Sequence, residues 1–148
     1  MIEAPEQALH TYESLQIGDR FETYRFISED DVLTFGRITG DDNPLHVDAE
    51  YAKTTRFGHR IVHGVFLLGL ISKVLGRDFP GHGSVAVSLA CRFLRPVRVG
   101  SKVRVEVKVV EKLDQKGYIQ AKTYIYTDRN KMALAGDATL IPPSVDSE

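Results

Sequence analysis

Residues 64–76, which read GVFLLGLISKVLG, decide the fold. They predict one helix, and apolar side chains recur on almost every side of it, so that only Ser72 and Lys73 interrupt the pattern. A helix of this kind needs protein around it on most sides. It is also too short to cross a bilayer, which takes about 20 apolar residues. We therefore expect this helix to be the buried centre of a globular domain.

Strand-like alternation flanks this helix on both sides in the sequence. Residues 21–27 alternate apolar and polar side chains, and four runs with the same two-residue period follow a turn at residues 80–83. Each of the first two runs is predicted to present one apolar face, formed by Val85, Val87, Leu89, Cys91 and Phe93 in one and by Val103, Val105, Val107 and Val109 in the other. Turn residues at 114–117 and 128–130 separate the last three runs at hairpin spacing, which predicts an antiparallel meander.

A sheet with one apolar face and a helix that is apolar on all sides can both bury their apolar surfaces if the sheet curls around the helix. The sequence therefore predicts an α+β class and a hot-dog fold, an antiparallel sheet wrapped around a central buried helix. The exposed edge strands of such a sheet need to be covered. Pairing with a second copy would cover them, so we expect a homodimer.

Length and composition limit the number of domains, the kinds of partner and the expected location. The chain has 148 residues, enough for one domain with a core at about 15–142 and loose ends at 1–10 and 142–148. A formal net charge of −1 gives no broad attraction to nucleic acid or to an anionic membrane. The single cysteine, Cys91, excludes an internal disulfide and a thiolate zinc site. Residues 1–15 show no secretory or transit pattern, so the expected location is the cytoplasm.

A polar loop separates the first strand from the buried helix. Ser28 is predicted to cap a short helix that Gly40 ends. Residues 41–46 follow as a loop, because the proline at position 44 opposes helical continuation, and Asp48 caps a further short helix to residue 53. The loop is therefore stiff enough to aim its side chains.

Asp41 and His46 lie on this loop, five residues apart. Near pH 7 such a carboxyl group is an anion and such an imidazole is mostly a neutral base. Together they could take a proton from one water molecule and return one elsewhere. From this spacing alone, a non-catalytic interpretation is the commoner one: Asp41 would be a turn residue, and His46 a solvated or core histidine. The catalytic hypothesis therefore depends on what lies next to the pair.

The start of the buried helix supplies such a neighbour. Its first backbone N–H groups have no partner within the helix, so that of Gly64 could bind the oxygen of a thioester carbonyl. The alternative is that Gly64 only permits tight packing. Ser72 lies roughly 80° around the helix from Gly64 and could face the same site, although a lone helical serine more often bonds the carbonyl one turn back. Val65, Leu68 and Ile71 are candidates to line a pocket there.

The combined motif resembles a known family. Residues 39–48 read TGDDNPLHVD, and FG at 57–58 and IVHG at 61–64 follow. This pattern is similar to the MaoC-like family of (R)-specific enoyl-CoA hydratases and 3-hydroxyacyl-thioester dehydratases. The resemblance extends from about residue 21 to 142 and includes PGHGS at 80–84 and FLRPVRVG at 93–100.

The resemblance implies an activity and a set of residues. It implies the reversible syn hydration of a trans-2-enoyl-CoA to an (R)-3-hydroxyacyl-CoA by a homodimeric enzyme of fatty acid metabolism that needs no cofactor. The implied site consists of Asp41 and His46 as the catalytic pair, Gly64 as the backbone donor, and Ser72, Asn43 and His63 as further substrate-site residues. The neighbouring Asp42 is expected to point outward.

Other interpretations of the same residues remain open. The fold would equally suit a 3-hydroxyacyl-ACP dehydratase, an acyl-CoA thioesterase or a non-catalytic acyl-thioester-binding protein. His59 and His63 have the spacing of two metal ligands, but the glutamate of H-E-x-x-H is missing, so we expect no metal. A set of cations near the end of one strand could meet a coenzyme A phosphate, although a solvated face is the commoner meaning of such a run: Arg92, Arg95, Arg98 and Lys102.

Overall fold

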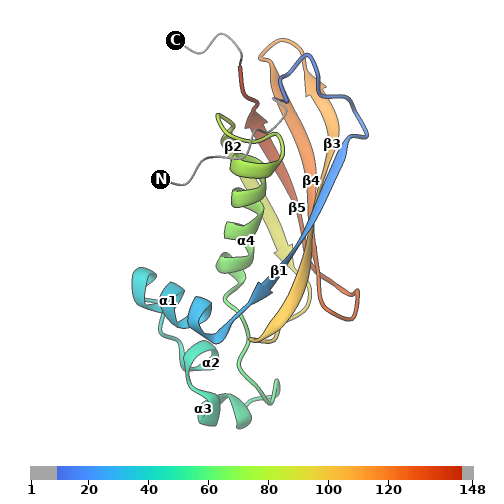
Figure 1. Ribbon diagram of the computed structural model, residues 1–148. Helices are drawn as coiled ribbons and strands as arrows, with labels where there is room; N and C mark the ends of the chain where they lie inside the picture. Colours follow the sequence, from blue (N-terminus) through green and yellow to red (C-terminus); the bar gives the residue numbers. More distant parts are fainter. Residues whose placement is uncertain (1–9, 145–148) are drawn as a thin grey trace.

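One antiparallel sheet of five strands, in the order β1-β3-β4-β5-β2, forms the body of the molecule in a computed structural model that describes residues 10–144. The strands are β1 (Arg20–Ile27), β2 (Val85–Phe93), β3 (Ser101–Leu113), β4 (Tyr118–Tyr126) and β5 (Met132–Ile141). Helix α4 (Gly64–Lys73) lies along one face of this sheet (Figure 1) and continues into the π-helical turn η1 (Val74–Asp78). The expected α+β hot-dog fold is confirmed. The predicted loose ends fall mostly outside the described residues.

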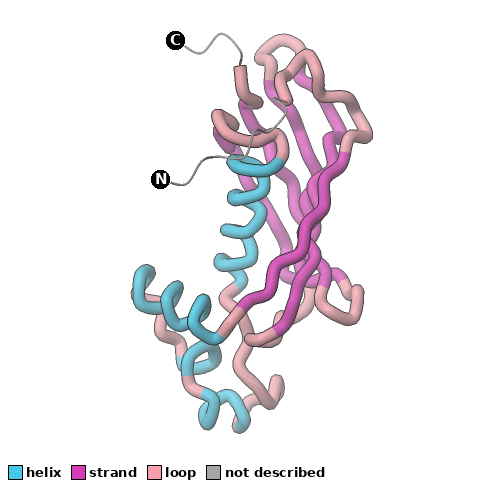
Figure 2. The backbone as a smooth tube through the Cα atoms, in the orientation of Figure 1, coloured by secondary structure: helices cyan, strands magenta, loops and turns pink. Residues whose placement is uncertain are grey.

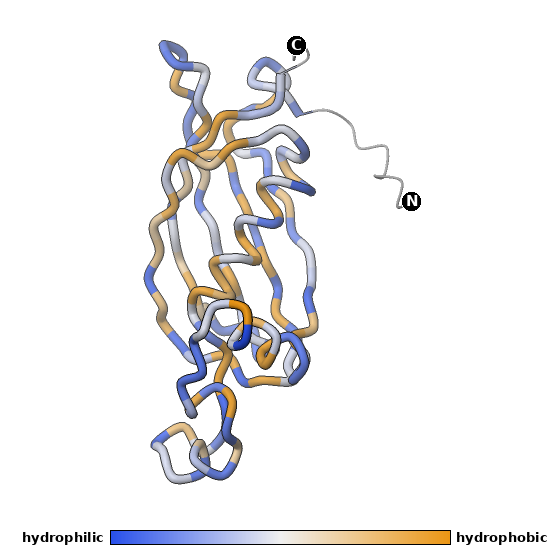
Figure 3. The backbone as a smooth tube through the Cα atoms, turned by 90° about the vertical axis from the view of Figure 1, so that its left-hand side faces the viewer, coloured by the Kyte–Doolittle hydropathy of each residue, from blue (hydrophilic) through white to orange (hydrophobic). Residues whose placement is uncertain are grey.

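The core lies between α4 and the sheet. The predicted apolar face of β3 is confirmed, because Val103, Val105, Val107 and Val109 are all buried. Helix α4 contributes Leu67, Leu70 and Ile71 from the opposite side. Figure 3 shows hydrophobic stretches along α4 and along the strands. Burying one such side chain stabilises a fold by roughly 1.5–3 kcal/mol, so this layer holds the helix against the sheet.

The predicted apolar face of β2 is only partly correct. A bulge between Ala86 and Ser88 shifts the pairing of β2 with β5. Leu89 therefore pairs with buried Ala138, whereas Val85 pairs with exposed Ile141 on the opposite face of the sheet. One extra residue in a strand reverses the side to which its neighbours point. The alternation counted along the sequence could not show that reversal.

The sheet covers α4 on one side only. In a single chain Val65 is 63% exposed, and Gly69 and Ser72 on the same stripe of the helix are exposed as well. The prediction that the helix is surrounded was therefore wrong for one chain, because a five-stranded open sheet does not close around it. Within residues 10–144, no helix is long and apolar enough to cross a membrane.

Three further helices gather at one end of the sheet (Figure 2): α1 (Glu29–Thr39), α2 (Pro44–Val47) and α3 (Ala49–Lys53). The predicted caps are present, with Ser28 at the start of α1, Gly40 at its end with φ of 79°, and Asp48 at the start of α3. The prediction that 41–46 is entirely loop was wrong at its end. Proline is tolerated at the first position of a helix, where its missing N–H would have no partner, so Pro44 begins α2.

Candidate active site

His46 lies on α2, and a hydrogen bond to the backbone carbonyl group of Ile61 fixes the orientation of its ring. The Nδ1 atom of His46 lies 2.7 Å from the carbonyl oxygen of Ile61. A carbonyl oxygen only accepts hydrogen bonds, so Nδ1 carries the proton and donates it. The other nitrogen, Nε2, is then left as a free proton acceptor. The ring is half-buried and lines an apolar pocket, so it can meet a ligand there.

Asp41 follows directly after the left-handed Gly40, which turns the chain away from α1. Its Oδ1 atom accepts a long hydrogen bond of 3.5 Å from the backbone N–H of Asn43. One carboxylate oxygen of Asp41 and one ring nitrogen each of His46 and His63 all lie within 4.8 Å of one another. Asp42 is exposed and is not part of this group, as expected. The structure therefore brings the predicted carboxylate and imidazole together.

His63 lies beneath this pair and is 2% exposed. Its Nε2 atom lies 3.0 Å from the carbonyl oxygen of Asp41, so it donates there and ties the loop to the start of α4. Its ring also stacks on that of His46, with centroids 4.0 Å apart and planes 30° apart. Its Nδ1 atom is buried and has no hydrogen-bond partner among the described residues. His63 therefore supports both members of the pair from behind, and it does not line the pocket.

The same three side chains are a group that could hold a metal ion, but the ring geometry opposes it. A metal ion binds an imidazole nitrogen in the plane of the ring. The rings of His46 and His63 face each other with planes only 30° apart and centroids 4.0 Å apart, so their in-plane lone pairs do not meet at one nearby point. His59, the other sequence candidate, is not in this group. The absence of a metal stays a prediction that this geometry favours.

The pocket beside His46 has a volume of about 440 Å³, within the range of roughly 300–1,000 Å³ that is common for small-molecule sites. Its walls are largely apolar and include Val62, Leu67, Phe93 and Val97. Gly64, the first residue of α4, also lines it, and His63 makes no side-chain cap for this helix. The N–H of Phe66 already donates to the carbonyl oxygen of His63, whereas the N–H of Gly64 precedes the hydrogen bonds of the helix and is available to a ligand at its positive end.

Gly64 also has a packing reason to be glycine. A Cβ atom built there would lie 2.9 Å from Cε1 of Phe93, closer than carbon atoms normally approach. The ring of Phe93 thus lies against the start of α4. Both interpretations of Gly64, close approach of a ligand and tight packing, therefore have support in the structure.

The other predicted site residues have different surroundings. Ser72 lies on the exposed stripe of α4, roughly 12 Å along the helix from Gly64, and does not line this pocket. Asn43 is exposed, and its Oδ1 atom accepts from the backbone N–H of Leu45 at 3.1 Å, which stabilises the start of α2. Of the three candidate pocket residues, Val65 lines the pocket, while Leu68 is half-buried and Ile71 is fully buried in the core.

Sequence reasoning missed two partners of the site. Phe93 was predicted as a residue of an apolar strand face and as the first residue of the FLRPVRVG stretch, and neither observation indicated contact with Gly64. The carbonyl oxygen of Ile61, which orients His46, has no sequence signal because every residue carries one. Only the tertiary structure brings the Phe93 ring and the Ile61 carbonyl group close to the site.

Comparisons with known proteins agree with this arrangement. The family profile described as the MaoC like domain matches residues 10–130. The chain is 36% identical over 141 residues to an (R)-specific enoyl-CoA hydratase of Rhodospirillum rubrum, covering 95% of this chain and 97% of that one. It is 42% identical over 112 residues to a 3-hydroxybutyryl-CoA dehydratase of Methylorubrum extorquens, covering 76% and 71%.

Solved structures extend the likeness to three dimensions. The (R)-hydratase of A. caviae superposes with a TM-score of 0.87 at 34% sequence identity, covering 88% of this chain and 99% of that one. An R-hydratase of Pseudomonas aeruginosa superposes with the same TM-score of 0.87 at 35% identity, covering 91% of this chain and 86% of that one. The likeness therefore extends over most of both chains in each comparison.

Proposed function

The chain belongs to the MaoC-like domain family, and from that premise we propose that it catalyses the reversible syn hydration of trans-2-enoyl-CoA to (R)-3-hydroxyacyl-CoA. One observation carries the proposal: a carboxylate oxygen of Asp41 lies within 4.8 Å of a ring nitrogen of His46, and His46 lines an apolar pocket. The two relatives named above are a CoA hydratase and a CoA dehydratase, which catalyse opposite directions of this kind of reaction.

The mechanism uses one water molecule held by the Asp41 carboxylate and by Nε2 of His46. Nε2 is free to accept a proton because Nδ1 donates to the Ile61 carbonyl. As the water oxygen bonds to C3, the pair removes one proton from it and delivers one proton to C2, while the C2–C3 double bond becomes single. A single water between two groups on one side of the substrate adds both parts from that side, which explains the syn course.

The start of α4 stabilises the charge that develops on the thioester oxygen. As C3 is attacked, electrons move toward this oxygen and give it enolate character. Gly64 lines the pocket at the positive end of the helix, and its N–H would donate a hydrogen bond to this oxygen that the helix dipole strengthens. Loss of such a donor typically slows a reaction by roughly 100- to 1,000-fold. The apolar walls of the pocket would hold the acyl part.

The test is hydration of crotonyl-CoA, followed as loss of the absorbance of the conjugated thioester. Asp41→Asn and His46→Gln keep the side-chain size but remove proton transfer, so we expect kcat to fall roughly 100- to 10,000-fold in each. Asp42→Asn is the matched control, because Asp42 is exposed and lies outside the convergent group. Equal rates in all four proteins would refute the proposal.

The same assay separates the alternatives. A thioesterase would release free coenzyme A, which a thiol reagent detects, and a binding-only protein would show no turnover. Comparison of crotonyl-CoA with a crotonyl thioester of an acyl carrier protein distinguishes the two carriers. We propose coenzyme A as the carrier, because the two relatives named above act on CoA thioesters.

We also propose that the active form is a homodimer. The edge strand β2 exposes apolar side chains, with Val85 55% and Val87 51% exposed, and the Val65 side of α4 is open. An uncovered apolar edge favours association, and a second copy would cover both regions. Light scattering of the purified protein tests this. A location in the cytoplasm and a reaction without metal or redox cofactor belong to the same proposal.

A further inference from the structure

A second pocket adjoins the one beside His46. The two share Arg95 and Pro96 in their walls, and the second has a volume of about 410 Å³. It lies between the segment that follows β2 and the turn between β4 and β5, so Arg98 from the first and Lys131 from the second both line it. A ligand that extends out of the first pocket past Arg95 would enter the second.

The second pocket is strongly basic in a chain of nearly neutral net charge. Four cations line it, namely Arg95, Arg98, Arg129 and Lys131, against one carboxylate, that of Asp128. Throughout residues 10–144, none of these four cations has an acidic group within ion-pair distance. Unpaired cations gathered in one hollow repel one another, and an anionic ligand removes that repulsion.

The pocket is also held in shape before any ligand arrives. Arg95 donates from Nη1 to the carbonyl oxygen of Met132 at 2.8 Å. The hydroxyl oxygen of Thr127 accepts from the backbone N–H groups of Arg129 at 3.3 Å and Lys131 at 3.2 Å, which fixes the turn that carries them. A preformed arrangement loses less entropy when a ligand binds.

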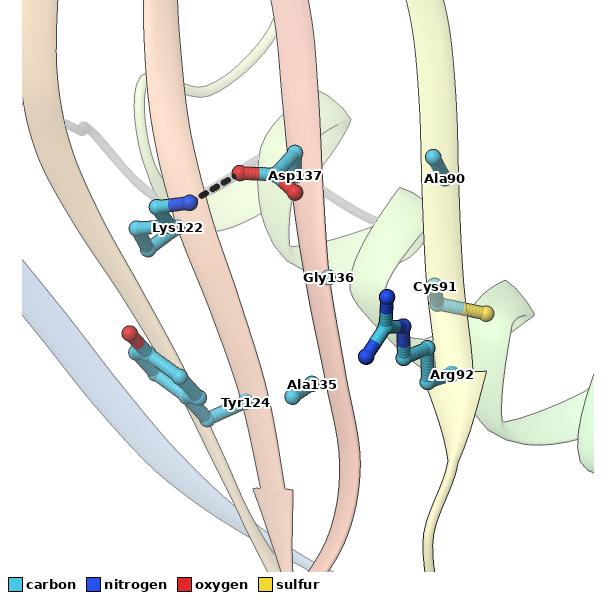
Figure 4. A pocket seen from close by; sticks show the side chains of 8 residues that line it. All are labelled: Ala90, Cys91, Arg92, Lys122, Tyr124, Ala135, Gly136 and Asp137. Atoms are coloured by element: carbon cyan, nitrogen blue, oxygen red, sulfur yellow. Dashed lines mark hydrogen bonds and ion pairs between the residues drawn. The ribbon is translucent and has the colours of Figure 1, made fainter.

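The structure divides the basic cluster that the sequence suggested. Arg92 lines a different hollow, on the face of the sheet that is turned away from α4 (Figure 4), where Lys122 pairs with Asp137. The hydrogen bond and the negative charge of Asp137 raise the pKa of Lys122, so Lys122 stays charged and its charge is compensated by Asp137. Lys102 lies over the ring of Tyr24. Of the four cations in the original cluster, only Arg95 and Arg98 line the second pocket.

Building on the proposed function, we propose that this pocket binds the phosphate groups of the coenzyme A nucleotide, its 3′-phosphate and diphosphate. Guanidinium groups bind phosphate oxygens in pairs of charge-assisted hydrogen bonds, and the ammonium group of Lys131 adds a point charge. Because this pocket adjoins the one beside His46, one molecule could place its thioester near His46 and its nucleotide among the cations. A hollow of this volume suits a nucleotide better than the broad convex surface of a protein.

Direct binding tests the proposal without relying on turnover. Isothermal titration of the full chain with adenosine 3′,5′-bisphosphate should give saturable binding. Arg98→Gln and Lys131→Gln should each weaken it roughly tenfold or more, the value of about one charge-assisted hydrogen bond. The matched control Arg92→Gln should bind like the unaltered protein. Absence of binding to the unaltered protein, or equal affinities in all four proteins, would overturn the proposal.

Kinetics connects the pocket to the reaction. For crotonyl-CoA, Arg98→Gln and Lys131→Gln should raise KM roughly tenfold and leave kcat unchanged. For crotonyl-pantetheine, which lacks the nucleotide, neither substitution should change KM. Equal changes with both substrates would contradict the proposal, as would an effect confined to the thioester of an acyl carrier protein, which would indicate a protein-docking surface. If no thioester is hydrated, the proposed function fails, while the titration still decides whether the pocket binds phosphates.

Discussion

The substitution Gly64→Ala separates the two reasons for glycine at the start of α4. The new Cβ atom would lie 2.9 Å from Cε1 and 3.0 Å from Cζ of Phe93, so the ring has to move. Overpacking typically costs about 1–3 kcal/mol, whereas replacing glycine by alanine in a helix gains about 0.4–1 kcal/mol. Phe93 is 53% exposed and can turn outward, so we expect a net destabilisation of roughly 0.5–2 kcal/mol.

The partner substitution Phe93→Ala removes the clash. In that background, Gly64→Ala should be neutral or stabilise by up to about 1 kcal/mol, which corresponds to a coupling of roughly 0.5–3 kcal/mol between the two positions. Urea unfolding of the four proteins at one temperature measures this cycle. A coupling near zero would mean that Phe93 does not confine Gly64.

Activity should respond differently from stability. If the helix end must come close to the thioester oxygen, the methyl group at position 64 obstructs it whether or not Phe93 is present. We therefore expect Gly64→Ala to lower kcat for crotonyl-CoA at least roughly tenfold in both backgrounds. Recovery of kcat together with stability in the double variant would refute this reasoning, since glycine would then be needed only for packing.

Three further changes test other parts of the structure. His63→Phe keeps the stacked ring but loses the hydrogen bond to the site loop, so kcat should fall roughly tenfold with KM unchanged, and His63→Gln, which retains an N–H donor, should retain more activity. The Asp31 carboxylate accepts a hydrogen bond from the backbone N–H of Ser28, which lowers the pKa of Asp31 below its ordinary value of 3.8. This interaction contributes about 1 kcal/mol to the free energy of unfolding above pH 3.8, and the contribution is lost as the pH falls through the lowered pKa. In Asp31→Asn, the free energy of unfolding should therefore depend less steeply on pH in that range. Gly136→Ala would push a methyl group against the carbonyl oxygen of Ala90 and should lower the free energy of unfolding by roughly 1–3 kcal/mol, measured by urea titration.

Local patterns were sufficient for much of the fold. Helix α1 begins after the capping residue Ser28 and ends before the left-handed Gly40, as predicted, because caps act on backbone groups a few residues away. The valines of β3 are buried because side-chain alternation follows from the geometry of a single strand. The first turn of α2 was missed, although proline at a helix start was also a local signal.

The candidate site was predictable as a set of residues and not as an arrangement. The loop motif at 39–48 identified Asp41 and His46, and the IVHG stretch at 61–64 identified Gly64, because the chemistry of these residues depends on residue type. The apolar composition of α4 predicted that other parts of the protein pack against it. Which side of α4 remains exposed in one chain depends on how far the five-stranded sheet curls around it.

The sequence by itself determined the helix that must be buried, the strands that alternate, and the loop that carries a carboxylate and an imidazole. Only the tertiary structure decided that His63 lies beneath both, that Ile61 orients His46, and that Phe93 confines Gly64. It also separated Arg92 from the basic pocket. The physical reason is range: caps and alternation are set by neighbours along the chain, whereas these contacts join segments that only the packing of α4 on the sheet brings together.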